Sequence, residues 1–441
     1  MPEKFVIYGG KPLKGEVEIK GAKNAAFPIL AAALLTRETC ILDNLPLIED
    51  VFQFLRVLEI LGAKISWLEK RRIRINCSEI NPLKIPPEIV CRFRGSVLLI
   101  GPFLARFNKV KIPPPGGCLI GARPIDTHLD AFSQAGIKVS ILSPDKENNK
   151  EKKDNLYFFE KKQQEGKEVI LREFSVTATE NLLLFFASKP QKTILKIADL
   201  DYQVQELIRV LKKMGVEVRE IGAHTIEIRG TKNPRGFQHK LISDPIETGT
   251  FIVATLATGG DVLIKNAELS FLTLFLKRLK DFGASFRIIN KDAIRVLPSG
   301  YRGSGQGVKN LKMDKIQSLP YPGIHSDLQP ELGVLATQTE GPTLIHDPLF
   351  EGRLKYLEEL NKMGANIIFC DPHRAVVYGP SKLQGIEISS LDLRAGAALI
   401  IAGLTAEGKT VINNIYQIDR GYERIEERLQ QLGADIRRVK E

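Results

Sequence analysis

The stretch RLKYLEELNKMGANIIFC (353–370) joins two different periodicities at a glycine. Every third residue from Leu354 to Met363 is apolar, which places these side chains along one face of an α-helix. Gly364 suits the left-handed residue that ends a helix, and the alternating residues after it are typical of a strand. The stretch therefore predicts a helix, a glycine cap and a return strand.

The same junction of helix, small residue and strand recurs along the whole chain, at intervals of roughly 70 to 80 residues. The six copies are LGAKI (61–65), AGIKV (135–139), MGVEV (214–218), FGASF (282–286), MGANI (363–367) and LGADI (432–436). One such unit cannot bury both faces of its sheet, whereas three units packed with their helices inward form a domain. We therefore expect two similar domains of three repeats, with a site in the cleft between them.

The bulk composition is that of an ordinary globular protein, with 43% hydrophobic and 26% charged residues among 441. The N-terminal residues MPEKFVIYGG lack the pattern of a signal peptide, and no apolar run reaches the roughly 18 residues that span a bilayer. We therefore expect a cytoplasmic protein that does not enter a membrane.

A net charge of +11 raises the question of nucleic-acid binding. The basic residues are spread along the chain, and the densest charged run (145–168) is mixed in sign, as in a solvated insertion. Aromatic and basic residues do not alternate as they do in RNA-binding modules. Anionic small substrates explain the charge at least as well, so we expect no nucleic-acid partner.

Cys118 lies in the loop-like stretch PPPGGCLIGARPIDTH (113–128). The thiol could be an incidental buried group, a metal ligand or a reactive group. The five cysteines form no CxxC pair and the six histidines no HExxH motif, which argues against a disulfide framework and a zinc site. Nucleotide-binding glycine loops of the usual spacings are also absent from the sequence.

Four further residues are candidates for a functional site: three cations that could bind an anion and one carboxylate. Lys23 precedes a small apolar helix, where it could face an anion together with helix-end amides, although an exposed lysine is the simpler interpretation. Asp327, at the start of another apolar helix, is an N-cap or a general base. Arg394 and Arg420 each follow an aspartate closely, which indicates either surface ion pairs or bidentate recognition of carboxylate or phosphate.

Eight blocks, in order along nearly the whole chain, resemble one family, the UDP-N-acetylglucosamine enolpyruvyl transferases. The blocks are GAKNAA (21–26), RGSVLLIGPFLARF (94–107), PGGCLIGARPID (115–126), IETGTF (246–251), YPGIHSDLQ (321–329), LFEGRL (349–354), DLRAG (392–396) and YQIDRGYERIEERLQQLGA (416–434). The cysteine loop in combination with the other blocks makes the resemblance specific.

The resemblance implies an α/β fold, the two-domain inside-out α/β barrel with three βαβ-type repeats per domain and an active site in the interdomain cleft. The implied domains are 1–22 with 243–441, and 23–242, which carries the Cys118 loop. The implied reaction transfers enolpyruvyl from phosphoenolpyruvate to the 3′-hydroxyl of UDP-N-acetylglucosamine and releases phosphate, by addition and elimination. It is the first committed step of peptidoglycan biosynthesis, needs no metal or organic cofactor, and supports cell shape and division.

The resemblance also assigns roles to residues. Cys118 resembles a general acid that can form an adduct with phosphoenolpyruvate and that fosfomycin alkylates, and Asp327 resembles the base for the sugar hydroxyl. With Lys23 and Arg420 they form the implied catalytic set. The residues implied for phosphoenolpyruvate are Lys23, Arg123, Arg394, Arg420 and Cys118. Those implied for UDP-N-acetylglucosamine are Asn24, Arg94, Arg123, Pro124, Ile125, Asp126, Ser175, Val176, Asp327 and Leu349.

Five positions depart from the family pattern and bear on substrate affinity or preference: Glu173, Thr177, Pro245, His325 and Gln417. Glu173 stands where the family often has lysine, so its charge is reversed near the expected diphosphate site. One alternative function is that of the related shikimate-phosphate enolpyruvyl transferase, against which GAKNAA and Cys118 argue. The other is a paralogue that binds the UDP-sugar without turnover.

Overall fold

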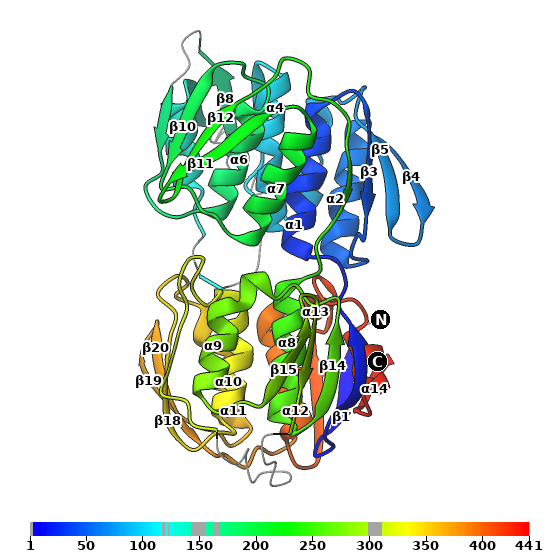
Figure 1. Cartoon of the computed structure of the whole chain (residues 1–441), viewed down its shortest axis with the longest axis vertical. Coiled ribbons are helices and arrows are strands. Elements are labelled where there is room, and N and C mark those ends of the chain that lie inside the picture. Colours follow the sequence, from blue (N-terminus) through cyan, green and yellow to red (C-terminus); the bar gives the residue numbers. More distant parts are fainter. Residues whose placement is uncertain are drawn as a thin grey trace, which may run out of the picture. The chain divides into compact units, whose positions relative to one another are not determined.

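The computed structural model describes residues 3–116, 120–121, 123–142, 156–162, 167–298 and 311–440. These residues form two compact units (Figure 1). The first unit contains the chain up to Lys20, Ile120 with Gly121, and the chain from Ser243 onward, whereas the second contains Gly21 to Ile242 apart from the loop segment. The domain boundaries expected from the sequence, and the cleft between the domains, stay predictions.

The first unit contains three four-stranded sheets among its described residues. Their strand orders are β21 (Glu387–Ser389), β22 (Lys409–Asn413), β1 (Glu3–Tyr8), β23 (Asp435–Lys440); β15 (Phe286–Asn290), β16 (Ala293–Val296), β14 (Asp261–Lys265), β2 (Lys14–Glu18); and β17 (Lys315–Gln317), β18 (Gly341–His346), β20 (Arg374–Gly379), β19 (Asn366–Asp371). Each sheet has one parallel pair at an edge, and its other pairs are antiparallel. The three sheets are therefore copies of one supersecondary unit.

Three helices of the first unit are buried along their whole length: α8 (Pro245–Ala257), α10 (Gln329–Ala336) and α12 (Leu393–Thr405). They pack against one another inside the sheets (Figure 1). The remaining helices are α9 (Thr273–Asp281), α11 (Tyr356–Lys362), α13 (Tyr416–Asp419) and α14 (Ile425–Gln431). Apolar and small residues occur on every side of these three helices, which favours burial all round, and their few polar side chains are buried with them.

The second unit repeats this plan with one variation. Its sheets have the orders β13 (Gln238–Lys240), β3 (Thr39–Asp43), β5 (Arg72–Asn76), β4 (Lys64–Glu69); β11 (Glu217–Gly222), β12 (Thr225–Arg229), β10 (Lys192–Lys196), β9 (Glu168–Ile170); and β6 (Lys109–Ile112), β8 (Leu156–Lys161), β7 (Ile137–Leu142). The last sheet, as far as it is described, has three strands, all antiparallel. Its middle strand, β8, lies within the charged run 145–168, and Phe159 on that strand is fully buried.

The helices of the second unit are α1 (Lys23–Ala32), α2 (Glu49–Leu61), α3 (Pro87–Val90), α4 (Ile100–Arg106), α5 (Asp126–Gln134), α6 (Val176–Phe186) and α7 (Tyr202–Lys213). Short 3₁₀ helices are η1 (Ala33–Leu35), η2 (Pro82–Lys84) and η3 (Arg94–Leu99) here, and η4 (Ser270–Leu272), η5 (Ser326–Leu328) and η6 (Arg353–Lys355) in the first unit. Among all described residues, none of the helices combines the length and apolarity that crossing a membrane requires.

The expected glycine caps are confirmed. All six glycines of the repeated junction have positive φ, between 84° and 110°: Gly62, Gly136, Gly215, Gly283, Gly364 and Gly433. A second repeated feature was not expected. Asn44, Asn266 and Asn414, which directly follow β3, β14 and β22, also have positive φ, between 53° and 59°. Asparagine tolerates the left-handed region better than most residues, so it suits these sharp exits from a strand.

Candidate active site

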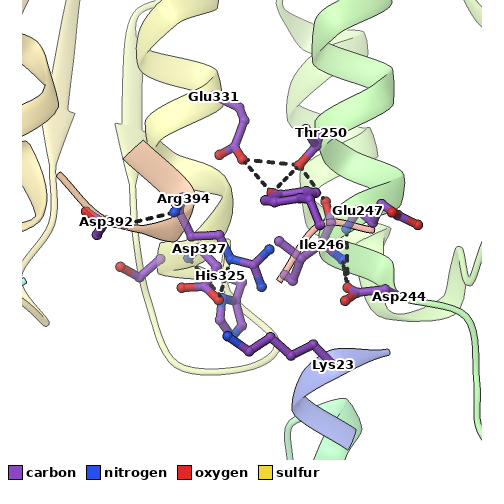
Figure 2. Close-up of polar contacts among 12 residues, drawn as sticks. Lys23, Asp244, Ile246, Glu247, Thr250, His325, Asp327, Glu331, Asp392 and Arg394 are labelled. Carbon is purple, nitrogen blue, oxygen red and sulfur yellow. Dashed lines mark hydrogen bonds and ion pairs between the residues drawn. The ribbon is translucent and has the colours of Figure 1, made fainter. Parts of the chain in front are cut away.

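Asp327 lies in η5, directly before the buried helix α10 of the first unit (Figure 2). The N-cap of η5 is His325, whose Nδ1 accepts a hydrogen bond from the Asp327 amide at 3.0 Å. The interpretation of Asp327 as an N-cap is therefore wrong. A histidine two residues earlier fills that role and leaves the aspartate carboxylate available for other partners.

The Asp327 carboxylate accepts hydrogen bonds from two buried arginines. Arg353 Nη2 donates to Oδ1 and Arg394 Nε donates to Oδ2, each at 3.0 Å. Burial acts to raise the pKa of Asp327, but Arg394, His325 and Arg353 outweigh it and hold the pKa well below its usual range. Asp327 is consequently an ionised carboxylate at neutral pH.

Arg394 is the second residue of α12 and is only 2% exposed. The side chain of Asp392 caps this helix by accepting hydrogen bonds from the amides of Arg394 (2.8 Å) and Ala395 (3.1 Å). The expected alternative of a surface ion pair is thus wrong for Arg394. Its Nη1 and Nη2 atoms are buried and have no hydrogen-bond partner in the described part of the chain. A buried guanidinium with two unused donors is prepared for a carboxylate or phosphate.

Arg420 follows α13 and is also buried. Its Nη1 donates to Gln417 Oε1 at 3.0 Å, so one of the five departures from the family pattern contacts a predicted site residue. The neighbouring Asp419 accepts two hydrogen bonds from Arg438, at 2.7 and 2.9 Å. Another departure, Pro245, is the first residue of α8 and is buried in the first unit.

The segment LFEGRL (349–354) contains Leu349, which was predicted as a site residue, and Arg353, which was not. Leu349 is exposed, and its amide donates to Asp347 Oδ1 at 3.0 Å. Arg353, the second partner of Asp327, was given no role from the sequence, although it belongs to this block. Cys118 lies outside the described residues. Shortly after it, the Ile120 carbonyl accepts a hydrogen bond from the Gly352 amide at 3.0 Å.

In the second unit, Lys23 is the first residue of α1 and is only 6% exposed. Its Nζ lies 2.8 Å from Asp50 Oδ2, in the first turn of α2, and 5.9 Å from the centre of the Phe27 ring. The interpretation of Lys23 as an exposed lysine is therefore wrong. Asn24, the next residue of α1, is half-buried. Asp50 was missed, although an acidic residue near a helix start was visible in the sequence.

Arg94 and Arg123 form a positively charged group in the second unit. Arg94 begins η3, and its Nη2 donates to the Pro124 carbonyl at 3.0 Å. Burial and the nearby Arg123 lower the pKa of Arg94 to about 10. Ile125 is buried, and Asp126 is the exposed first residue of α5. Two guanidinium groups close enough to affect each other favour an anion between or beside them.

The start of α6 carries the last predicted residues. Ser175 is the N-cap and accepts a hydrogen bond from the Ala178 amide at 3.4 Å, and Val176 is half-buried behind it. Two departures from the family pattern connect this region to α5. Glu173 Oε1 accepts a hydrogen bond from Thr127 Oγ1 at 2.7 Å, and Thr177 Oγ1 lies 3.0 Å from His128 Nε2.

His128 is therefore the hydrogen-bond partner of Thr177 within the second unit. Burial, helped by Arg94, lowers its pKa to about 3, which keeps the imidazole neutral at physiological pH. The structure thus brings together Asp327 with Arg394 in one unit, and Arg94 with Pro124 in the other. Within the residues described, no group of three or more His, Cys, Asp or Glu side chains could hold a metal ion. The expectation of no cofactor stays a prediction.

Comparisons of the whole chain identify its class. Residues 7–429 match the family model for EPSP synthase (3-phosphoshikimate 1-carboxyvinyltransferase). The structure resembles the enolpyruvyl transferase NikO from Streptomyces tendae, with a TM-score of 0.86, 24% identity and 99% of each chain covered. It also resembles EPSP synthase from Acinetobacter baumannii, with a TM-score of 0.72, 17% identity and 100% of each chain covered. These likenesses confirm the predicted fold class.

Curated relatives narrow the assignment. UDP-N-acetylglucosamine 1-carboxyvinyltransferase of Koribacter versatilis is 37% identical, covering 100% of this chain and 97% of the relative. The enzyme of the same name from Finegoldia magna is 39% identical, covering 97% of this chain and 96% of the relative. The chain therefore belongs to the enolpyruvyl transferase family, within its branch of UDP-N-acetylglucosamine 1-carboxyvinyltransferases.

Proposed function

We propose that the protein transfers the enolpyruvyl group of phosphoenolpyruvate to the 3′-hydroxyl of UDP-N-acetylglucosamine and releases phosphate. This reaction would make it the enzyme of the first committed step of peptidoglycan biosynthesis, acting in the cytoplasm. Full-length relatives at 37% to 39% identity bear the name of this activity. In the structure, the observation that supports it best is Arg394, whose two buried Nη donors are unused in the described residues.

Both substrates carry several negative charges, so binding them requires fixed cations. The guanidinium of Arg394 presents two parallel donors, the arrangement that pairs with a carboxylate or a phosphate. Lys23, Arg123 and Arg420 are the further cations that we assign to phosphoenolpyruvate. Arg94, with Arg123, supplies positive charge for the sugar nucleotide.

Addition joins the sugar oxygen to C2 of phosphoenolpyruvate, while its methylene carbon gains a proton and the sugar hydroxyl loses one. Elimination then removes that carbon's extra proton and breaks the bond to phosphate. We assign Asp327 as the base for the sugar hydroxyl and Cys118 as the acid for the methylene carbon. Asp327 is ionised and can accept a proton, but two arginines weaken its basicity. An anion bound to Arg394 shares that positive charge, so substrate binding strengthens the base.

The alternatives have less support. For the shikimate-phosphate enzyme, the sequence identity to EPSP synthase of Acinetobacter baumannii is 17%, whereas the identity to the curated relatives is 37% to 39%. The non-catalytic paralogue rests on the departures at Glu173 and Thr177. Glu173 accepts a hydrogen bond from Thr127, and Thr177 lies beside a neutral histidine, so both side chains have partners inside the second unit.

The test follows phosphate release and detects the carboxyvinyl product by mass spectrometry, with UDP-N-acetylglucosamine or shikimate 3-phosphate as acceptor. We expect product only with the UDP-sugar. The Asp327→Ala variant should lose about 100-fold or more in kcat, the range of general-base catalysis, while its affinity for the UDP-sugar changes little.

Asp371→Asn is the matched control, because Asp371 also pairs with an arginine, Arg374, but on the strands β19 and β20. It should retain full turnover. If the wild-type protein binds the UDP-sugar but forms no product, the non-catalytic paralogue is correct. Near-normal turnover of Asp327→Ala would remove the assigned base while leaving the overall reaction in place.

A further inference from the structure

Three buried polar side chains of the first unit form a triangle, in which each lies within hydrogen-bonding distance of the other two. Thr250 Oγ1 lies 3.1 Å from Glu331 Oε1 and 2.9 Å from Tyr422 Oη, and Tyr422 Oη lies 3.1 Å from Glu331 Oε1. Thr250 comes from α8, Glu331 from α10, and Tyr422 from the segment between α13 and α14 (Figure 2 labels Thr250 and Glu331). Thr250 and Tyr422 lie in two of the blocks that carry the family resemblance, but none of the three residues was given a site role from the sequence.

The triangle fixes an aromatic ring that supports Arg394. The Cζ atom of Arg394 lies 5.2 Å from the centre of the Tyr422 ring, a cation–π arrangement. Asp327 holds the Nε edge of the same guanidinium. The group is thus held on one edge by a carboxylate and on one face by a ring, so its remaining donors, Nη1 and Nη2, have a fixed direction.

The polar triangle occupies a part of the core that apolar side chains could fill. Burying a carboxyl, a phenol and a hydroxyl costs free energy unless they are hydrogen-bonded, and an apolar trio of similar volume would avoid this cost. Glu331 Oε2 is buried without a partner among the described residues. Each of the three inner helices contributes to the arrangement, Thr250 from α8, Glu331 from α10 and Arg394 from α12. The position of the guanidinium therefore depends on all three repeats.

We propose that Tyr422 is a positioning residue for Arg394, held in place by Thr250 and Glu331, and that it aligns the two free guanidinium donors with the anion of phosphoenolpyruvate. This inference rests on the proposed function for the identity of that anion. It predicts a specific kinetic effect, because a misdirected guanidinium weakens binding of phosphoenolpyruvate and leaves the sugar-nucleotide contacts intact.

The test compares Tyr422→Phe, which keeps the ring and removes the hydroxyl, with the wild-type protein. We expect KM for phosphoenolpyruvate to rise about threefold to tenfold, the effect of one lost buried hydrogen bond. KM for UDP-N-acetylglucosamine should stay unchanged. Glu331→Gln, which retains an acceptor oxygen, should show a smaller rise than Tyr422→Phe.

Tyr356→Phe is the matched control. Tyr356 is a fully buried tyrosine of the same unit, and its hydroxyl accepts a hydrogen bond from Gln329 Nε2 at 2.9 Å. Both Tyr→Phe variants should lose similar thermal stability, but only Tyr422→Phe should raise KM for phosphoenolpyruvate. Equal effects of the two variants on KM, or loss of stability without a change in KM, would show that Tyr422 is only a structural residue.

The experiment separates this inference from the proposed function. If the wild-type protein catalyses the reaction, the KM values for phosphoenolpyruvate decide whether Tyr422 positions Arg394. If it does not, the proposed function fails, and the inference is tested by titrating phosphoenolpyruvate calorimetrically into wild-type, Tyr422→Phe and Tyr356→Phe proteins. Weaker binding to Tyr422→Phe alone supports positioning of Arg394 by the ring, whereas equal affinities, or binding to none of them, overturn it.

Discussion

Glu331 shows how burial changes the chemistry of a single carboxyl. Desolvation raises its pKa to about 7, although Arg394 and hydrogen bonds from Thr250 and Tyr422 act in the opposite direction. The unfolded chain should release this proton near pH 4.5, the ordinary value for glutamate. Between these two pH values the folded protein binds more protons than the unfolded protein. Folding stability due to Glu331 therefore falls as the pH rises from about 4.5 to 7.

Replacing Glu331 by Gln should flatten this part of the stability profile. The shift corresponds to about 3 kcal/mol across the window, from roughly 1.36 kcal/mol for each pKa unit. Urea unfolding of wild-type and Glu331→Gln proteins at pH 5 and pH 7 measures the difference. The comparison isolates Glu331 because the rest of the chain is the same in both proteins, and Asp327 titrates below this window because its pKa is lowered. Equal slopes in the two proteins would contradict the prediction.

For single residues, the sequence predicted which residues belong to the site better than it predicted the residues that they contact. Asp327 and Arg394 were both selected, but their ion pair joins positions far apart in the chain, and periodicity carries no information on such contacts. Arg353 was missed for the same reason. The alternative interpretation of Lys23 as an exposed lysine failed because a helix start indicates exposure only where no neighbouring element covers it, and α2 supplies Asp50.

The helix endings are the elements that the sequence predicted most completely. A glycine before a strand has a local cause, because the left-handed conformation at a helix end disfavours any side chain. All six predicted junctions have this conformation. The asparagines after β3, β14 and β22 have an equally local cause, and they were readable as a repeat in LDN, IKN and INN. They were missed because the repeat was recognised by its helix ends alone.

Gly433 allows the cost of this conformation to be measured by itself. Its φ is 92°, and a Cβ placed there would meet no atom within 4 Å, so Gly433→Ala adds backbone strain without a clash. We expect a loss of about 1 to 2 kcal/mol in the free energy of unfolding, determined by chemical denaturation.

Gly222 provides the control. A Cβ there also meets nothing within 4 Å, but its φ lies outside the left-handed region. Gly222→Ala should leave the free energy of unfolding unchanged or slightly higher. Equal losses in the two variants would show that the repeated glycines are not explained by backbone conformation.

At the scale of the whole molecule, the net charge affects the rate of encounter with anionic substrates more than any single ion pair does. The chain carries a formal charge of +11, and both proposed substrates are anions. Such a charge raises the rate of encounter with anions, and salt screens it over a distance of about 10 Å at 0.1 M ionic strength. The sequence revealed this property in full, whereas the placement of each cation required the fold.

We expect kcat/KM for both substrates to fall severalfold between about 50 and 300 mM KCl, with kcat nearly constant. Steady-state kinetics at several salt concentrations measure the slope. Sucrose at matched osmolarity is the control and should have little effect. A value of kcat/KM that does not change with salt would mean that only contact pairs, and not the overall charge, attract the substrates.

The pairing of β1 has a consequence for the order in which the chain can fold during synthesis. β1 lies between β22 and β23, pairing Phe5 with Ile412 on one side and with Arg438 on the other. The ribosome has made every strand of the second unit once Ile242 is added, but β1 has no partner until the last strands emerge. An apolar strand without partners can pair with other chains, so the N-terminal strand is open to aggregation on the ribosome until the chain is nearly complete.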